Sequence, residues 1–160
     1  MPTRTTAAFT TGESPAAAKM NADAKGWVAS ETMTSTTSAI TAETTLAMPT
    51  TSGTSVPLLA NRRYLILVYL QFTSAGGTAV ARVRIKEDGT VVGMGGISVP
   101  TTTGYEVSLT VQTQVTTTAD VTKTYTVTVE RVDGTGTLVC NGLLSGSPNR
   151  LQIIDIGPSS

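Results

Sequence analysis

Acidic residues are the first candidates for chemistry, because hydrolases that cleave sugars need two carboxyl groups on facing positions. Glu87 and Asp88 are adjacent, and Glu130 lies three residues before Asp133. Asp88 and Asp133 are each followed by glycine, a pairing that is typical of turns. We therefore interpret both pairs as solvated strand ends rather than as a general acid and a general base.

Other side chains that could act as nucleophiles or metal ligands are scarce. The 160 residues include no histidine, the commonest general base near neutral pH and the commonest metal ligand. The single Cys140 lies in an apolar segment, 138–144, where a thiol is expected to be buried and inert. Neither Asp88 nor Asp133 stands among the alternating Asp and Asn residues of a calcium loop. We expect no catalytic residue, no cofactor and no metal site.

The charge pattern also argues against nucleic acid or a membrane as partner. Eleven basic and eleven acidic residues give a formal net charge of +0. The densest basic cluster, formed by Arg82, Arg84 and Lys86, lacks interleaved aromatic residues and has the spacing of one strand face. The longest apolar run, 64–70, is far too short to cross a bilayer, and the first residues lack the apolar core of a secretory signal. We expect a soluble protein made in a cytoplasm.

Composition and periodicity indicate that these residues are carried by strands. Charged residues make up only 14% of the chain, and threonine, a β-branched residue that favours strands, takes much of their place. Strict alternation of apolar and polar residues in 105–111 and 125–130 predicts strands with one wet face. Asp88–Gly89 predicts a hairpin turn, and the glycines at 93, 95 and 96 suggest a kink or bulge in the strand that follows. The prediction is an all-β fold, an antiparallel β-sandwich.

One strand is apolar on both faces, although an antiparallel sheet normally leaves one face in water. Its residues are Tyr64, Leu65, Ile66, Leu67, Val68, Tyr69 and Leu70. Either a second layer of the same chain covers both faces, or a neighbouring copy covers one of them. Covering several hundred Å² at roughly 25 cal/mol per Å² would contribute on the order of 10 kcal/mol before the costs of association. The segment is thus a candidate for core or for an oligomer interface.

The first residues read differently and predict an arm over 1–30, followed by the sandwich over 31–160. A short helix is expected over about 15–25, since Ser14 can cap its start, Pro15 suits its first turn and Gly26 can close it. An isolated helix of this length is marginal in water and needs a surface to dock on. We expect the arm to attach the protein elsewhere, and its anchoring residues are Phe9, Pro15, Met20 and Trp27.

Three blocks of sequence, in this order, resemble one family. They are the opening 8–21 followed by Gly26–Trp27, the block 59–64 with a long apolar strand and then 81–89, and the ending 153–158. Together they resemble small virion structural proteins of tailed phages that infect actinobacteria, over most of the chain.

The resemblance implies a jelly-roll-like sandwich that associates as a homotrimer on the particle surface, with an N-terminal segment bound to other virion proteins. It implies a non-enzymatic minor tail or fibre-like subunit. Two alternatives stay open: a capsid decoration protein of the same architecture, and a receptor- or glycan-binding module whose loops 74–77 and 101–104 contact the host cell surface.

Overall fold

The computed structural model describes residues 26–33, 35–48, 50–101, 106–141 and 149–159, and this part of the chain folds as β-strands without a helix. The strands are β1 (Gly26–Thr32), β2 (Thr44–Thr45), β3 (Thr54–Leu58), β4 (Arg62–Ala75), β5 (Ala79–Glu87), β6 (Thr90–Val99), β7 (Val107–Thr117), β8 (Val121–Gly134), β9 (Thr137–Cys140) and β10 (Arg150–Pro158). The all-β prediction is confirmed.

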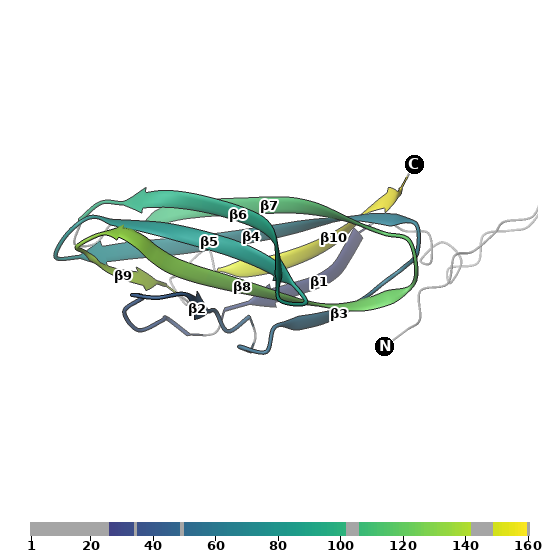
Figure 1. Cartoon of the computed structure of the whole chain (residues 1–160), viewed down its shortest axis with the longest axis horizontal. Coiled ribbons are helices and arrows are strands. Elements are labelled where there is room, and N and C mark those ends of the chain that lie inside the picture. Colours follow the sequence, from purple (N-terminus) through teal and green to yellow (C-terminus); the bar gives the residue numbers. More distant parts are fainter. Residues whose placement is uncertain (1–25, 34, 49, 102–105, 142–148, 160) are drawn as a thin grey trace, which may run out of the picture.

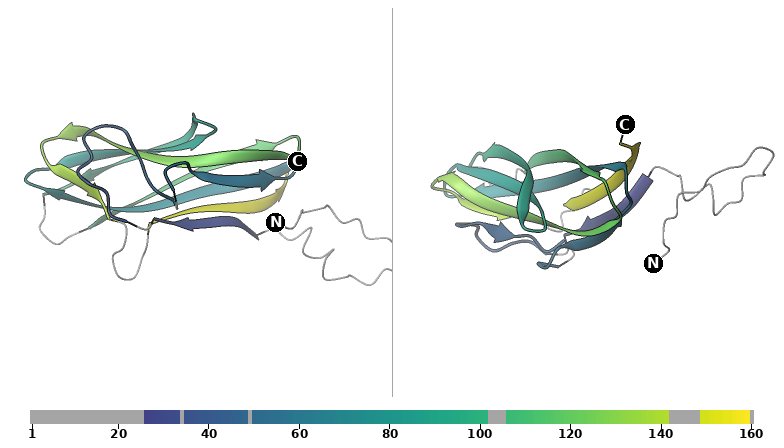
Figure 2. Two further views of the ribbon diagram at one scale, coloured as in Figure 1. Left: turned by 90° about the horizontal axis from the view of Figure 1, so that it is seen from below. Right: turned by 45° about the vertical axis from the view of Figure 1, so that its right-hand side comes forward.

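The strands form two antiparallel sheets that lie one above the other (Figures 1 and 2). Sheet A has the order β1-β10-β4-β7, and β9 continues the position of β10 along β4. Sheet B has the order β2-β8-β5-β6, and β3 shares with β2 the position beside β8. The chain crosses repeatedly from one sheet to the other, and this strand order is that of a jelly roll. The predicted antiparallel sandwich is therefore confirmed.

The core between the sheets follows from the alternation that the sequence predicts. On β4 every second residue from Tyr64 to Phe72 is at most 1% exposed, and these side chains meet buried residues of β5 and β8. The β5 and β8 contributions are Ala79, Ala81, Val83, Ile85, Tyr125, Val127 and Val129. Their apolar side chains exclude water between the layers and hold the sheets together.

The hairpin between β5 and β6 turns where the sequence predicts. Asp88 and Gly89 both have positive φ, 48° and 85°, as a two-residue turn of this kind requires. A register shift follows, because Ile85 pairs with Gly93 whereas Lys86 pairs with Val91. The expected bulge is therefore present, and Val92 is its extra residue.

The glycines of β6 have a further role that the sequence did not predict. A Cβ added at Gly95 would lie 2.7 Å from Val111 Cγ2 on β7, and one at Gly93 would lie 3.0 Å from Thr113 Cβ. The Thr113 hydroxyl also donates a hydrogen bond of 2.7 Å to the carbonyl oxygen of Val92. The missing side chains thus let the edge of sheet B approach the edge of sheet A and close one side of the sandwich.

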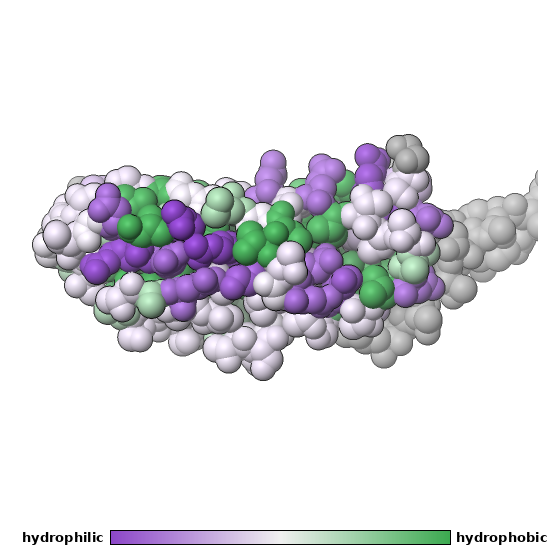
Figure 3. All heavy atoms as spheres, in the orientation of Figure 1, coloured by the Kyte–Doolittle hydropathy of each residue, from purple (hydrophilic) through white to green (hydrophobic). Residues whose placement is uncertain are grey.

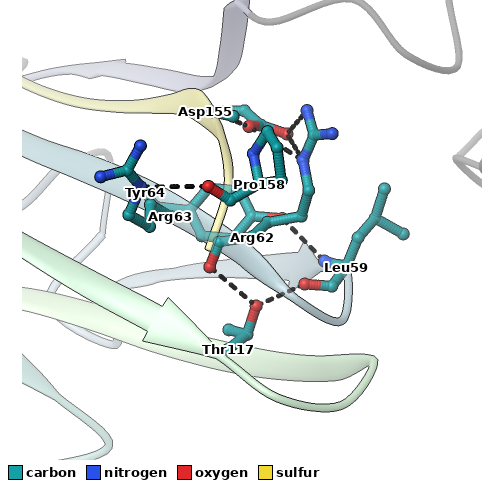
Figure 4. Close-up of polar contacts among 8 residues, drawn as sticks. Leu59, Arg62, Arg63, Tyr64, Thr117, Asp155 and Pro158 are labelled. Carbon is teal, nitrogen blue, oxygen red and sulfur yellow. Dashed lines mark hydrogen bonds and ion pairs between the residues drawn. The ribbon is translucent and has the colours of Figure 1, made fainter. Parts of the chain in front are cut away.

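A buried ion pair closes the end of the sandwich where β10 finishes (Figure 4). Asp155 is 1% exposed and accepts hydrogen bonds from Arg62 Nε at 3.0 and 3.1 Å and from the Gly157 amide at 2.9 Å. The Tyr64 hydroxyl accepts a 2.7 Å bond from the Leu59 amide nearby. Because a buried carboxylate is costly without partners, these donors account for its position in the core.

The sheet begins earlier in the chain than the predicted boundary between arm and sandwich. Residues 26–30, expected in the arm, belong to β1 and pair with β10. Trp27 is therefore part of the sandwich. The predicted helix over 15–25 and the anchoring residues Phe9, Pro15 and Met20 lie outside the described residues. In the described part of the chain there is no helix of the length and apolarity that crossing a membrane requires.

Candidate assembly surface

The outer face of sheet B is charged, and its charges are paired with one another. Arg84 Nη2 lies 2.7 Å from Glu130 Oε2, and Lys86 Nζ lies 2.7 Å from Glu43 Oε1. The hydrogen bond from Lys86 is the main reason why the pKa of Glu43 lies below its usual value. Figure 3 shows charged side chains gathered over β5 and β8, with apolar groups beside them. The basic row that the sequence predicts on this strand face is thus balanced by carboxylates.

The acidic residues considered for catalysis have structural partners. Asp88 accepts hydrogen bonds from Lys123 Nζ at 2.8 Å and from the Thr124 amide at 2.9 Å, and the bond from Lys123 is the main cause of its lowered pKa. Glu87 accepts a 2.7 Å bond from the Tyr125 hydroxyl, and Asp133 accepts one from the Gly134 amide at 2.6 Å. These contacts fasten a turn and two strand ends. The described residues contain no group of three or more acidic or cysteine side chains placed to hold a metal ion.

Cys140 lies in the core, as the sequence predicts. Its side chain is 0% exposed, and burial raises the pKa of the thiol to about 12. Asn149 Nδ2 lies 3.2 Å from its sulfur. A thiol in this environment stays protonated at neutral pH and is a poor nucleophile.

The apolar strand predicted over 64–70 forms the middle of β4, and its two faces have different surroundings. Tyr64, Ile66, Val68 and Leu70 point into the core. Leu65, Leu67 and Tyr69 point to the other side and are only half-buried. Sheet B covers the inner face, and among the described strands none packs on the outer face of sheet A. The second layer of the same chain thus accounts for one face of the strand, and the other, open face has no covering strand among the described ones.

Cross-strand register extends this open face beyond β4. Leu65 pairs with Ile154 on β10, and Ile154 pairs with Trp27 on β1. Residues directly opposite each other in antiparallel strands share a face, so the three side chains lie in one row. Trp27 is 60% exposed. We call Trp27, Leu65, Leu67, Tyr69 and Ile154 the outer apolar patch.

Polar side chains surround the outer apolar patch, among them the charged Arg150, which pairs with Tyr69, and Arg63, which lies two residues before Leu65 on β4. Leu67 pairs with Gln152 on one side and with Gln112 on the other. The Tyr69 hydroxyl lies 2.9 Å from Ser108 Oγ and accepts a 3.3 Å bond from Gln71 Nε2. An apolar centre with few charges and a polar rim is the composition found at the cores of protein interfaces.

Two members of the patch could not have been chosen from the sequence. Trp27 was expected in the arm, and Ile154 was noted only within the ending 153–158 that carries the resemblance. Both join the patch only because β10 lies between β1 and β4, which is a long-range pairing.

The loops considered for ligand binding are partly described. Ser74 Oγ closes the β4–β5 turn with a 2.7 Å bond to the carbonyl oxygen of Gly77, whereas residues 102–105 lie outside the described part.

No protein-family model matches the chain, and no curated protein matches it either. Several solved structures are similar at low identity, and three of them are described here. One is a carbohydrate-binding module from Cellvibrio mixtus lichenase 5A in complex with cellotriose, with a TM-score of 0.39 and 18% identity over 79% of this chain and 96% of that chain. The second is infectious bursal disease virus, Gt strain, with a TM-score of 0.37 and 15% identity over 82% of this chain and 36% of that chain. The third is a mutant VP2 protein of infectious bursal disease virus from derived T=1 particles, with a TM-score of 0.37 and 13% identity over 79% of this chain and 38% of that chain.

Proposed function

We propose that the chain is a non-enzymatic structural subunit of a tailed-phage virion, of the minor tail or fibre-like kind. Copies associate as a homotrimer through the outer apolar patch, and the N-terminal segment binds other virion proteins. The resemblance of the sequence blocks implies the particle and the trimer. The open face of sheet A supports the association.

The observation that carries the proposal is the position of the patch. Five large apolar side chains lie together on a sheet face that no described strand covers, and Trp27 among them is 60% exposed. The opposite face carries the paired charges, and the exposed Val91 and Met94 of β6 lie singly beside them, in cross-strand pairs with Lys86 and Arg84. Removing the patch from water would stabilise a complex at roughly 25 cal/mol per Å², whereas the charged face gains little from contact because its ions are already paired.

A substitution at the centre of the patch tests this proposal. Leu67→Asp adds a charge that is solvated in a lone molecule but desolvated in a complex. We expect the variant to fold with the β-rich circular dichroism of the parent and to sediment as a monomer under conditions where the parent forms a trimer. Trp27, the only tryptophan of the chain, supplies a second readout: its emission should shift to shorter wavelength on assembly of the parent and not of the variant.

The matched control is Thr122→Asp, which adds the same charge at an exposed position of sheet B. It should leave the trimer intact. A parent chain that stays monomeric at all concentrations, or a Leu67→Asp variant that assembles as the parent does, would overturn the proposal. A monomer that binds host-wall polysaccharide would instead support the receptor- or glycan-binding alternative.

The alternative of a capsid decoration protein uses the same architecture and the same association. It differs in place on the particle. Immunogold labelling of purified virions with an antibody against the sandwich separates the two: label on the tail supports the minor tail subunit, and label on the head supports decoration.

A further inference from the structure

Residues 35–48, which we call the strap, close one side of the sandwich. Near the start of the strap, the Ile40 amide donates a 2.8 Å hydrogen bond to the carbonyl oxygen of Leu138 on β9 of sheet A. Near its end, the Leu46 amide donates a 2.9 Å bond to the carbonyl oxygen of Val127 on β8 of sheet B. The strap therefore crosses from one sheet to the other, on the side away from β6 and β7 (Figure 1).

The strap supplies part of the core but has little regular structure. Its side chains Ile40, Leu46 and Met48 are at most 2% exposed. Its strand, β2, has two residues, whereas β4 and β8 have 14 each. A segment with few ladder hydrogen bonds can open locally while the strands of a core stay folded. The strap is thus a candidate for separate opening.

A single charge fastens the strap to the outer face of sheet B. Glu43 is the only charged residue in 32–61. Its Oε1 accepts a 2.6 Å hydrogen bond from Thr128 Oγ1 and lies 2.7 Å from Lys86 Nζ, and its Oε2 lies 3.3 Å from Arg84 Nη1. These three partners belong to β5 and β8, so one carboxylate joins the strap to two strands.

Arg84 depends on this carboxylate. Its Nη2 lies 2.7 Å from Glu130 Oε2 on β8, and its Nη1 faces Glu43. Among the described residues Nη1 is buried without a hydrogen-bond acceptor, and the ion pair with Glu43 balances its charge. A buried cationic group without a counter-ion is costly. Loss of the Glu43 charge is therefore expected to disfavour the closed strap, because an open strap admits water to Arg84.

We propose that the strap opens as a unit while the rest of the sandwich stays folded, and that the negative charge of Glu43 is the latch that keeps it closed. Opening uncovers the β8 backbone beside β2 and the core behind Ile40 and Leu46. The inference goes beyond the association proposed above, since it concerns the edge of sheet B and not the outer apolar patch.

The latch should weaken in acid. The groups that face Glu43 are Arg84 and Lys86 from β5 and Thr128 from β8, with Glu130 on the far side of Arg84. The hydrogen bond from Lys86 is the main reason why the pKa of Glu43 lies below its usual value. A group whose pKa is lower in the closed state favours that state above its ordinary pKa, and this preference is lost as the pH falls through the lowered pKa.

Amide hydrogen exchange of the full chain, measured residue by residue by NMR, tests the latch. Glu43→Gln removes the charge and keeps the shape and the acceptor oxygen of the side chain. At neutral pH the amides of Ile40 and Leu46 should exchange about 3- to 10-fold faster than in the parent, whereas those of β4 keep their rates. Lowering the pH from about 6 to about 3 should increase strap opening in the parent, after correction for intrinsic exchange, and far less in Glu43→Gln.

The matched control is Glu130→Gln, which removes the same charge from the other side of Arg84 and leaves the strap contact in place. The strap should exchange no faster than in the parent, and equal acceleration in both variants would overturn the role of Glu43. Strap amides that keep the parental rate in Glu43→Gln, or that accelerate by the same factor as those of β4, would overturn the separate opening. Leu67→Asp lies on the other sheet, so neither result changes the test of the proposed association.

Discussion

At the scale of single residues, Asn149 shows how a gap in a strand is filled. β9 ends at Cys140 and β10 begins at Arg150, and both pair with β4, so the amide of Gln71 has no ladder partner between them. Asn149 Oδ1 accepts a 2.7 Å bond from that amide, and its Nδ2 donates a 2.6 Å bond to the carbonyl oxygen of Asn141. The side chain is 0% exposed. The side-chain amide of Asn149 thus makes the hydrogen bonds that a strand backbone would make at this position of sheet A.

We expect Asn149→Ala to lower the free energy of unfolding by about 1–3 kcal/mol, because the Gln71 amide and the Asn141 carbonyl are left buried without this partner. Urea denaturation followed by circular dichroism measures the change. Gln112→Ala, at an exposed amide on the same sheet, is the control and should change stability by less than about 0.5 kcal/mol. Equal effects of the two substitutions would show that Asn149 does not stabilise the gap between β9 and β10.

At the scale of elements, the seam between β6 and β7 depends on glycine for space. Gly95→Ala places a methyl group 2.7 Å from Val111 Cγ2, and two strands or a side chain must move to admit it. Overpacking of this kind costs about 1–3 kcal/mol. Gly96→Ala is a close control, since the neighbouring glycine is exposed and its nearest contact is the Ala81 carbonyl oxygen at 3.3 Å. Thermal unfolding should show a lower midpoint for Gly95→Ala than for Gly96→Ala, and the reverse order would contradict the seam.

Local patterns explain which elements were predictable. Asp88–Gly89 fixes a two-residue turn by its own backbone preferences, and the alternation in β8 places Tyr125, Val127 and Val129 in the core. The function of Gly95 was not predictable in this way, because it depends on Val111 lying across the sandwich. Glycine is used both where a strand bends and where a neighbouring strand needs space, so the sequence does not distinguish these two roles.

The candidate site was predictable only where it lies on one strand. Leu65, Leu67 and Tyr69 were recognised because β4 is apolar throughout. Trp27 was assigned to the arm, since the residues before it have helical composition and nothing local shows that it pairs with Ile154. Long-range register joins these residues into one patch, and a single sequence carries little information about it.

At the scale of the whole molecule, the outer faces of the two sheets differ in their side chains. Sheet B carries ion pairs, such as Arg84 with Glu130, that are stable while they are exposed to water. Sheet A carries the outer apolar patch. The proposed association uses sheet A, where the apolar side chains of neighbouring strands form one row. The chain enters sheet A at Gly26, the first residue of β1, and the next residue, Trp27, belongs to the outer apolar patch.

This arrangement predicts where truncation begins to damage the sandwich. Removal of residues 1–25 leaves β1 complete, and we expect the shortened chain to keep the thermal midpoint of the parent while losing attachment to the particle. Removal of residues 1–32 takes away β1, which pairs with β10 from Asp155 to Arg150, and exposes that strand as a new edge next to the core. The second truncation should unfold at lower temperature and aggregate in size-exclusion chromatography. If removal of 1–25 alone lowered the midpoint to the same extent, the N-terminal segment would be part of the folded core, and its proposed role as an attachment arm would be wrong.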